Sequence, residues 1–190
     1  SSDLTGALPA AKARFGSDLP PTLVVVAQRL LDNFDGLMAL RRQRSGDSVT
    51  LVHGDFHPGQ ISYPSERGGR FAVFDWQTVS AGGGGDDLAR IMSTGLTPEQ
   101  RRACEGQLIE LYRSLLLEHG VTDYDDARCL DDFRSGLVTT AAINIIASVS
   151  IDPAFIAEFE ATSEFTVADA MFGWLAAAIE DHGVLDSWPV

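Results

Sequence analysis

The chain has 190 residues, of which 45% are hydrophobic, enough to bury one sizeable core. The formal net charge of −13 argues against a nucleic-acid backbone as partner; it is compatible with a cationic substrate, and equally with a surface that favours solubility. No apolar stretch approaches the roughly 18 residues that span a bilayer, and the start lacks a secretion signal pattern. Cys104 and Cys129 show no metal-ligand spacing, so we expect reduced thiols in a cytoplasmic protein without a membrane partner.

The first part of the chain predicts one long helix. Residues 1–20 carry no clear pattern and are expected to form a loose lead-in. From Thr22 to Gln43, apolar residues recur with a period of about 3.6, as they do on one face of an amphipathic helix.

Three apolar runs then predict short strands. They are Val49–Val52, Ile61–Tyr63 and Phe71–Phe74, which combine branched and aromatic side chains suited to a pleated, half-buried surface. The segment Pro64–Gly69 is rich in turn residues and is expected to turn the second run back as a hairpin.

Two carboxylates follow strand-like runs of this region. Asp55 comes after the first run and a His53-Gly54 step, and Asp75 comes directly after the third run. If the strands pair, the two carboxylates can face one cleft, where one can take a proton and the other can hold a cation.

The glycine run Gly82–Gly85 invites comparison with a phosphate-binding loop. Such a loop must feed a helix N-terminus without competing negative charge, whereas Asp86 and Asp87 follow here at once. We therefore expect a flexible turn into a helix that begins near Asp87.

The remainder of the chain predicts further helices, which makes the fold class α+β and mostly helical. Thr97-Pro98-Glu99-Gln100 has the pattern of a capped helix start, and that helix should end near Gly120. Further helices are expected from about Thr122 to Ser150 and, in the later part of a segment that Asp152-Pro153 opens, from Phe165 to Ile179. Their apolar stripes are assigned to the core.

Four short motifs follow one another in this part of the chain: His53-Gly54-Asp55, Gln60, Phe74-Asp75-Trp76 and Asp87-Leu88-Ala89. In this order they resemble the catalytic segment of the aminoglycoside and choline kinase-like phosphotransferases, distant relatives of the protein kinases. The similarity extends from Val49 to Ala89, and the run from Phe74 to Gly82 looks closest to the ecdysteroid kinase-like (CHK-like) branch. Gln60 stands where the family usually has Asn.

The resemblance implies a function and a role for each matching residue. Residues 21–190 would form the C-lobe of a protein-kinase-like fold, with a β-hairpin region bearing the catalytic loop, and would transfer the γ-phosphate of ATP or GTP to a hydroxyl of a small molecule. Asp55 would be the catalytic base, while Asp75 and Gln60 would hold Mg²⁺. His53 would brace the loop, and Asp87 would tie down its backbone.

The chain shows no sign of the N-lobe that such a kinase needs. No glycine-rich strand-turn-strand precedes Val49, and the sole lysine, Lys12, lies outside any strand pattern. Most nucleotide-binding residues are therefore expected in a missing N-terminal lobe. The isolated chain is expected to be inactive and to expose an apolar face near its start.

Two other functions fit parts of the sequence. Gln60 and the missing lobe favour a catalytically silent binding or regulatory module that keeps the fold. The run His53-x-Asp55-x-His57 also resembles the ligand set of a metal-dependent hydrolase, although the only other histidines, His119 and His182, lie near expected helix ends.

Overall fold

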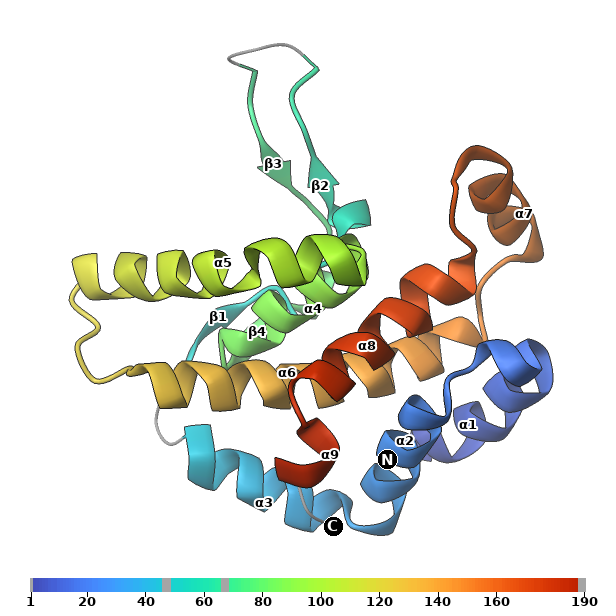
Figure 1. The fold of residues 1–190 in the computed structure, drawn as a ribbon, viewed down its shortest axis with the longest axis horizontal. Coiled ribbons are helices and arrows are strands. Elements are labelled where there is room, and N and C mark those ends of the chain that lie inside the picture. The colour runs from blue at the N-terminus through green and yellow to red at the C-terminus, as the bar shows by residue number, and fades with distance from the viewer. Residues whose placement is uncertain (1, 46–48, 66–68, 188–190) are drawn as a thin grey trace.

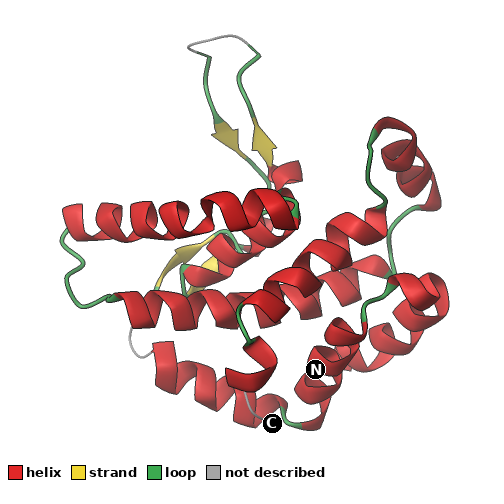
Figure 2. Cartoon of the chain, viewed as in Figure 1, coloured by secondary structure: helices red, strands yellow, loops and turns green. Residues whose placement is uncertain are grey.

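The computed structural model describes residues 2–45, 49–65 and 69–187, and helices dominate it, as expected (Figures 1 and 2). Four short strands form two antiparallel two-stranded sheets within these residues. The helices are α1 (Ser2–Phe15), α2 (Pro21–Asp32), α3 (Phe34–Ser45), α4 (Gly85–Gly95), α5 (Pro98–Glu118), α6 (Asp126–Ser148), α7 (Pro153–Thr162), α8 (Trp174–Asp181) and α9 (Val184–Ser187). The strands are β1 (Thr50–Val52), β2 (Ile61–Ser62), β3 (Ala72–Val73) and β4 (Ser80–Gly82).

Helix α6 is the centre of the core. It contacts α1, α3, α4 and α8, and it buries Phe133, Leu137, Ala141 and Ile145 completely at four-residue spacing. Helix α4 approaches it most closely at Gly136, where an added Cβ would lie 2.5 Å from the carbonyl oxygen of Gly85. Small residues at this crossing therefore set the distance between the two helices that carry the candidate site.

The N-terminal segment is not a loose lead-in, so that prediction is wrong for residues 2–15. Helix α1 places Leu4, Leu8 and Ala11 in the core. Arg14 donates hydrogen bonds to backbone carbonyls that follow the last turn of α6, including that of Ile151 at 2.6 Å. Pro9 weakens the helical pattern of the sequence, and the helix is stabilised by tertiary packing instead.

The long helix predicted from Thr22 to Gln43 is divided in two. Helix α2 ends before Asn33, whose φ of −147° is not helical, and α3 begins at Phe34. The Asn33 side chain accepts a hydrogen bond from the backbone N–H of Gly36 at 3.2 Å. Such local side-chain bonds compete with the helical ladder, which explains the break despite a continuous apolar pattern.

The strands pair partly as expected. β2 and β3 form the predicted hairpin, with Ile61 opposite Val73, although its turn lies partly outside the described residues. β1 pairs with β4, with Leu51 opposite Ala81. The sequence did not predict β4, because Ser, Ala and Gly have little strand preference. In Figure 1 the hairpin projects from the helical body beside α5.

The glycine run forms the expected turn into a helix that begins near Asp87, and its glycines also allow close packing. Gly82 belongs to β4, and Gly85 opens α4. A side chain at Gly84 would collide with the hydroxyl of Tyr112, and one at Gly85 with the backbone of Asp132. Glycine is required here because α4 begins directly against α5 and α6.

The later helices follow the prediction. The capping box at the start of α5 is complete, with Gln100 N 3.3 Å from Thr97 Oγ1 and Thr97 N 3.0 Å from Gln100 Oε1. The helix expected from Phe165 contains a π-helical turn at Asp169–Gly173 before α8. Among the described residues no single helix is long and apolar enough to cross a membrane; α6 and α7 pass by length and composition only as a pair bent by 114°.

Candidate functional site

The loop after β1 is anchored to the first turn of α4. Both carboxylate oxygens of Asp87 accept backbone hydrogen bonds, from His53 N at 2.6 Å and from Gly54 N at 3.0 Å. Gly54 has a φ of +82°, and an added Cβ would lie 2.5 Å from the carbonyl oxygen of Thr78. A glycine is therefore needed at this position both for its conformation and for space. The bonds expected of Asp87 are present.

His53 links this loop to the strand that precedes Asp75. Its side chain is buried, with Nε2 2.9 Å from the carbonyl oxygen of Phe74 and Nδ1 3.3 Å from the backbone N–H of Asp55. Because a carbonyl can only accept, Nε2 donates and Nδ1 accepts, so both ring nitrogens are engaged. The ring also lies 4.8 Å from that of Trp76. His53 thus braces two segments, as the resemblance implied.

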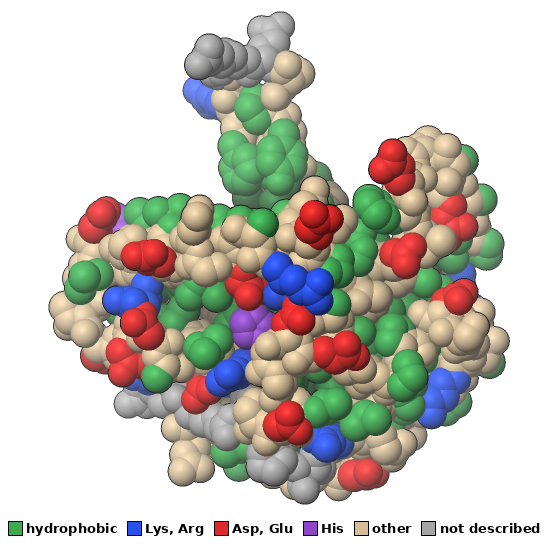
Figure 3. Space-filling model, in the orientation of Figure 1, with side chains coloured by type: hydrophobic (Ala, Val, Ile, Leu, Met, Phe, Trp, Pro, Cys, Tyr) green, Lys and Arg blue, Asp and Glu red, His purple; other side chains and the backbone are tan. Residues whose placement is uncertain are grey.

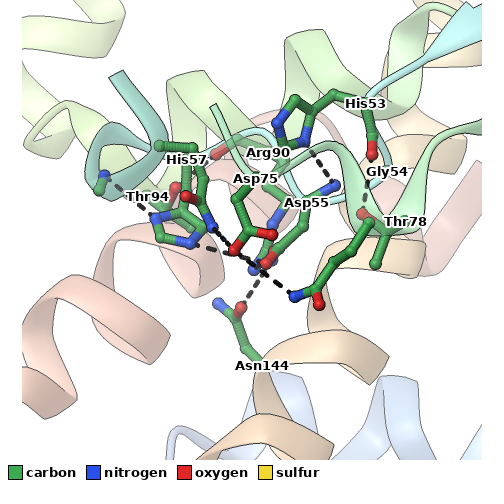
Figure 4. A network of polar contacts seen from close by, with 12 residues as sticks. His53, Gly54, Asp55, His57, Asp75, Thr78, Arg90, Thr94 and Asn144 are labelled. Atoms are coloured by element: carbon green, nitrogen blue, oxygen red, sulfur yellow. Dashed lines mark hydrogen bonds and ion pairs between the residues drawn. The ribbon is translucent and has the colours of Figure 1, made fainter. Parts of the chain in front are cut away.

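Asp55 is held by one oxygen and open at the other. Its Oδ1 forms an ion pair with the guanidinium of Arg90, and its Oδ2 lies 3.7 Å from His57 Nε2, beyond hydrogen-bond distance (Figure 4). The Asp55 side chain is 27% exposed. One oxygen is therefore fixed by a buried cation while the other remains available to a bound molecule.

Arg90 belongs to a buried chain of polar groups. Its other terminal nitrogen donates to Asn144 Oδ1 at 2.8 Å, and Asn144 Nδ2 donates to the carbonyl oxygen of Met171 at 2.6 Å. These residues come from α4, α6 and the π-helical turn. Burial lowers the pKa of Arg90, while Asp55 raises it. Three elements thus cooperate to hold one guanidinium against Asp55.

Asp75 adopts a backbone conformation that is unusual for a residue other than glycine. Its φ is 63° and its ψ 56°, in the left-handed region, where Asp and Asn are the best tolerated side-chain-bearing residues. Its Oδ2 accepts from Gln60 Nε2 at 3.1 Å and from Gln77 Nε2 at 3.5 Å. The structure therefore brings Gln60 and Asp75 together, and the local strain is of a kind concentrated at functional sites.

His57 lies among the charged groups of both segments. Burial lowers its pKa below the ordinary 6.5, and of its charged neighbours Asp55 and Asp75 raise it while Arg90 lowers it. Nδ1 accepts a hydrogen bond from Gly59 N at 3.1 Å, so the neutral ring carries its proton on Nε2, toward Asp55. In Figure 4 the side chains of Asp55, Asp75 and His57 lie in one network, so the two carboxylates are on the same side of the molecule.

A pocket of about 680 Å³ opens beside Asp55. Asp55, His57 and Arg90 lie at its polar end, and apolar side chains from α6, α7 and the π-helical turn line the rest. Asp75 is not among its lining residues. In Figure 3 a notch separates the hairpin from α7, and hydrophobic side chains are exposed along it.

The hydrogen bonds of His53 disfavour the metal-dependent hydrolase alternative. His53 uses both ring nitrogens within the protein, so it has no lone pair for a metal. Over the described parts of the chain, no group of three or more His, Cys, Asp or Glu side chains is arranged to hold a metal ion. The His53-x-Asp55-x-His57 spacing is explained by loop bracing instead.

Arg90 and Asn144 are the site residues that the sequence did not reveal. Arg90 follows Asp87 by three residues and lies on the same side of α4, but an arginine on a helix is usually solvated. Asn144 interrupts an apolar stretch of α6. A polar residue in such a stretch indicates a buried hydrogen-bonding partner, and this was the one signal in the sequence that could have revealed the site residue.

The profile of a protein family described as "Uncharacterized oxidoreductase dhs-27" matches residues 33–135 of the 190, more than half of the chain. The chain belongs to this family. The dhs-27 family is related to ecdysteroid kinase-like proteins, and the matched range includes Asp55, Asp75, Asp87 and Arg90. No curated protein and no solved structure matches the chain.

Proposed function

We propose that this chain is the catalytic C-lobe of a phosphotransferase that moves the γ-phosphate of ATP or GTP to a hydroxyl of a small molecule. The observation that best supports the proposal is how the Asp55 carboxylate is held beside the pocket. One oxygen is fixed by Arg90, and the other faces a pocket large enough for a small molecule. A base that is held and yet open at one oxygen suits an acceptor hydroxyl.

In this mechanism the hydroxyl of the acceptor donates a hydrogen bond to Asp55 Oδ2. Its oxygen forms a bond to the γ-phosphorus as the bond between that phosphorus and the β,γ-bridging oxygen breaks, and the hydroxyl proton passes to Asp55. Such proton transfer typically contributes about 10²–10⁴ in rate. Arg90 keeps the carboxylate in place, and His57 Nε2–H offers a donor to the same hydroxyl oxygen.

Asp75 and Gln60 fit a magnesium site as far as their chemistry goes. Mg²⁺ is commonly held by one or two carboxylates together with substrate phosphates, and here one carboxylate lies 3.1 Å from a side-chain amide. Gln60 presents its nitrogen to Asp75, so its amide would have to turn to offer oxygen. The Gln60 side chain is one methylene longer than the Asn usual in the family, and it still reaches Asp75. When bound, Mg²⁺ would neutralise phosphate charge.

An exposed apolar surface supports a second lobe that supplies the rest of the nucleotide site. The strand region and hairpin leave large side chains in solvent, among them Leu51 at 72% exposed and Tyr63 at 67%. We expected such a face near the start of the chain, but Leu4, Leu8 and Ala11 of α1 are buried, and exposed large apolar residues occur around β1–β4 and along α5. An apolar face of this kind is typical of an interaction site.

The oxidoreductase description of the family has less support from this site. Dinucleotide-binding oxidoreductases use a parallel sheet whose first strand leads into a helix, and both sheets of the described residues are antiparallel. The phosphotransferase proposal uses the loop carboxylates, the strained Asp75 and the pocket together.

The experiment is a phosphoryl-transfer assay on the full-length protein with labelled ATP and GTP and a panel of hydroxylated metabolites. Asp55→Asn should reduce turnover far more than nucleotide affinity, whereas Asp75→Asn should weaken magnesium-dependent nucleotide binding itself. Asp123→Asn, an exposed acid on the loop before α6, is the matched control and should leave both unchanged.

Two results would count against the proposal. Wild-type rates in both the Asp55 and Asp75 variants would exclude the assigned roles. Magnesium-dependent nucleotide binding without transfer to any acceptor would favour the silent module. If a second lobe supplies most nucleotide contacts, as we propose, residues 1–190 alone should show no appreciable transfer.

A further inference from the structure

The pocket beside Asp55 is apolar over most of its wall. Helix α7 contributes to this wall although none of its residues is buried, and Phe155 is 55% exposed. A pocket with apolar walls and a few polar groups at one end usually binds a ligand that has a large apolar part and one polar end. The main apolar wall residues are Ile143, Ile151, Phe155, Phe159, Val167 and Met171.

The charges at the polar end cancel. Among the described residues that line the pocket, Asp55 is the only acid and Arg90 the only permanently charged base, and they form an ion pair with each other. His57 adds no acid to this end, and its Nε2 lies 3.7 Å from Asp55 Oδ2. The Arg90 side chain is 8% exposed and is anchored by Asn144, so the pair is a fixed part of the pocket.

This neutrality decides which acceptors bind well. An ammonium group that entered the pocket would lose its hydration, and the one carboxylate among the lining residues, Asp55, is already neutralised by Arg90 even though its Oδ2 is open. An uncharged apolar body gains free energy from burial against the same walls. The net charge of −13 does not change this, because exposed charges beyond a Debye length of about 8–10 Å are screened. Figure 3 shows acidic side chains dispersed over the visible face.

We propose that this pocket selects an uncharged, mainly apolar alcohol over a cationic amino alcohol or amino sugar, and that Arg90 sets the selection by neutralising Asp55. The inference rests on the proposed function only in taking the ligand to be the acceptor of the reaction. It disfavours a cationic substrate, with which the net charge of −13 alone is compatible.

The test is the binding of two matched probes to the chain, adamantanol and aminoadamantanol, measured by isothermal titration calorimetry without nucleotide. Wild-type protein should bind adamantanol at least about tenfold tighter than its ammonium analogue, because the unpaired charge must leave water. Arg90→Gln frees the Asp55 charge and should shrink or reverse this ratio. Arg70→Gln, an exposed arginine on the hairpin, is the matched control and should leave the ratio unchanged.

Two further variants keep the test decisive if Arg90→Gln fails to fold. Arg90→Lys retains the positive charge and should retain the preference. Phe159→Ser should weaken both probes, adamantanol by at least about fivefold, and leave their ratio near the wild-type value, because the two probes share the same apolar body and the substitution removes apolar wall and no charge.

Several results would overturn the inference. Equal or tighter binding of aminoadamantanol to the wild type, no binding of adamantanol, or an unchanged ratio in a folded Arg90→Gln variant would each do so. Binding of neutral alcohols without phosphoryl transfer by the full-length protein would defeat the proposed function alone. Transfer to amino sugars only would defeat this inference alone.

Discussion

Replacement of Asn144 by alanine would test whether the chain of buried polar groups behind Asp55 stabilises the fold. Asn144 is 2% exposed and makes two hydrogen bonds, one from Arg90 at 2.8 Å and one to the Met171 carbonyl at 2.6 Å. The substitution leaves a buried guanidinium nitrogen and a buried carbonyl without these partners. Both groups lie inside the junction of α4, α6 and the π-helical turn.

The expected loss follows from these two bonds. A hydrogen bond to a charged group contributes about 1.5–3 kcal/mol net, and a neutral one about 0.5–1.5 kcal/mol. Asn144→Ala should therefore lower the free energy of unfolding by about 2–4 kcal/mol. For a chain whose total stability is about 5–15 kcal/mol, this is a large fraction.

Urea unfolding followed by circular dichroism measures this loss as a lower midpoint at unchanged slope. Gln107→Ala, on the exposed side of α5, is the control and should change stability by less than about 0.5 kcal/mol. The double variant Arg90→Met/Asn144→Ala should be more stable than the sum of the single effects predicts, by about 1–2 kcal/mol. A loss below about 0.5 kcal/mol in Asn144→Ala would refute the reasoning.

Three further predictions concern the loop, the pH dependence and the N-terminal helix. Gly54→Ala should cost at least about 1–2 kcal/mol of stability, because alanine is strained at positive φ and its Cβ meets Thr78; wild-type stability would contradict this. Burial alone would raise the pKa of Glu105, but His182 and Arg101 lower it below its ordinary 4.5, and Arg102 and Arg101 lower the pKa of Asp181 below its ordinary 3.8. The two acids therefore contribute their full stability above these ordinary values, and the contribution is lost as the pH falls through the lower folded-state pKa values. Asp181→Asn should therefore flatten the acid side of a plot of urea midpoint against pH, and an unchanged slope would exclude this origin. Arg14→Ala should lower the free energy of unfolding by about 1 kcal/mol, and with it the melting temperature, because its bonds to backbone carbonyls at and after the end of α6 are lost; an unchanged melting curve would mean that these bonds contribute nothing.

The sequence predicted the parts of the site that depend on local chemistry. The strand-like runs before Asp55 and Asp75 were enough to expect these two carboxylates near one another, because a hairpin joins its two ends, whereas the place of Gln60 beside Asp75 was expected from the resemblance. The Asp87 bonds to the loop were expected from the resemblance. Helix starts with a capping box or a first-turn proline were also predictable, since their signals lie within four residues.

Features that depend on tertiary packing could not be predicted in this way. Arg90 and Asn144 meet across 54 sequence positions, and nothing local distinguishes this arginine from a solvated one. The glycine run was interpreted as flexible because its close neighbours, Tyr112 and Asp132, lie on later helices. Helix α1 has a weak pattern, and only the groove formed by the other helices makes it stable.

The hairpin has a consequence for how this site can vary. Phe74 N donates to the carbonyl oxygen of Gln60 at 3.1 Å, and Ile61 faces Val73 in the next ladder position. This first rung alone sets the separation of Gln60 and Asp75, whatever the length of the ribbon beyond it. The outer part of the hairpin can therefore lengthen, shorten or change sequence among relatives, or accept an inserted tag, while the two residues at its base keep their spacing.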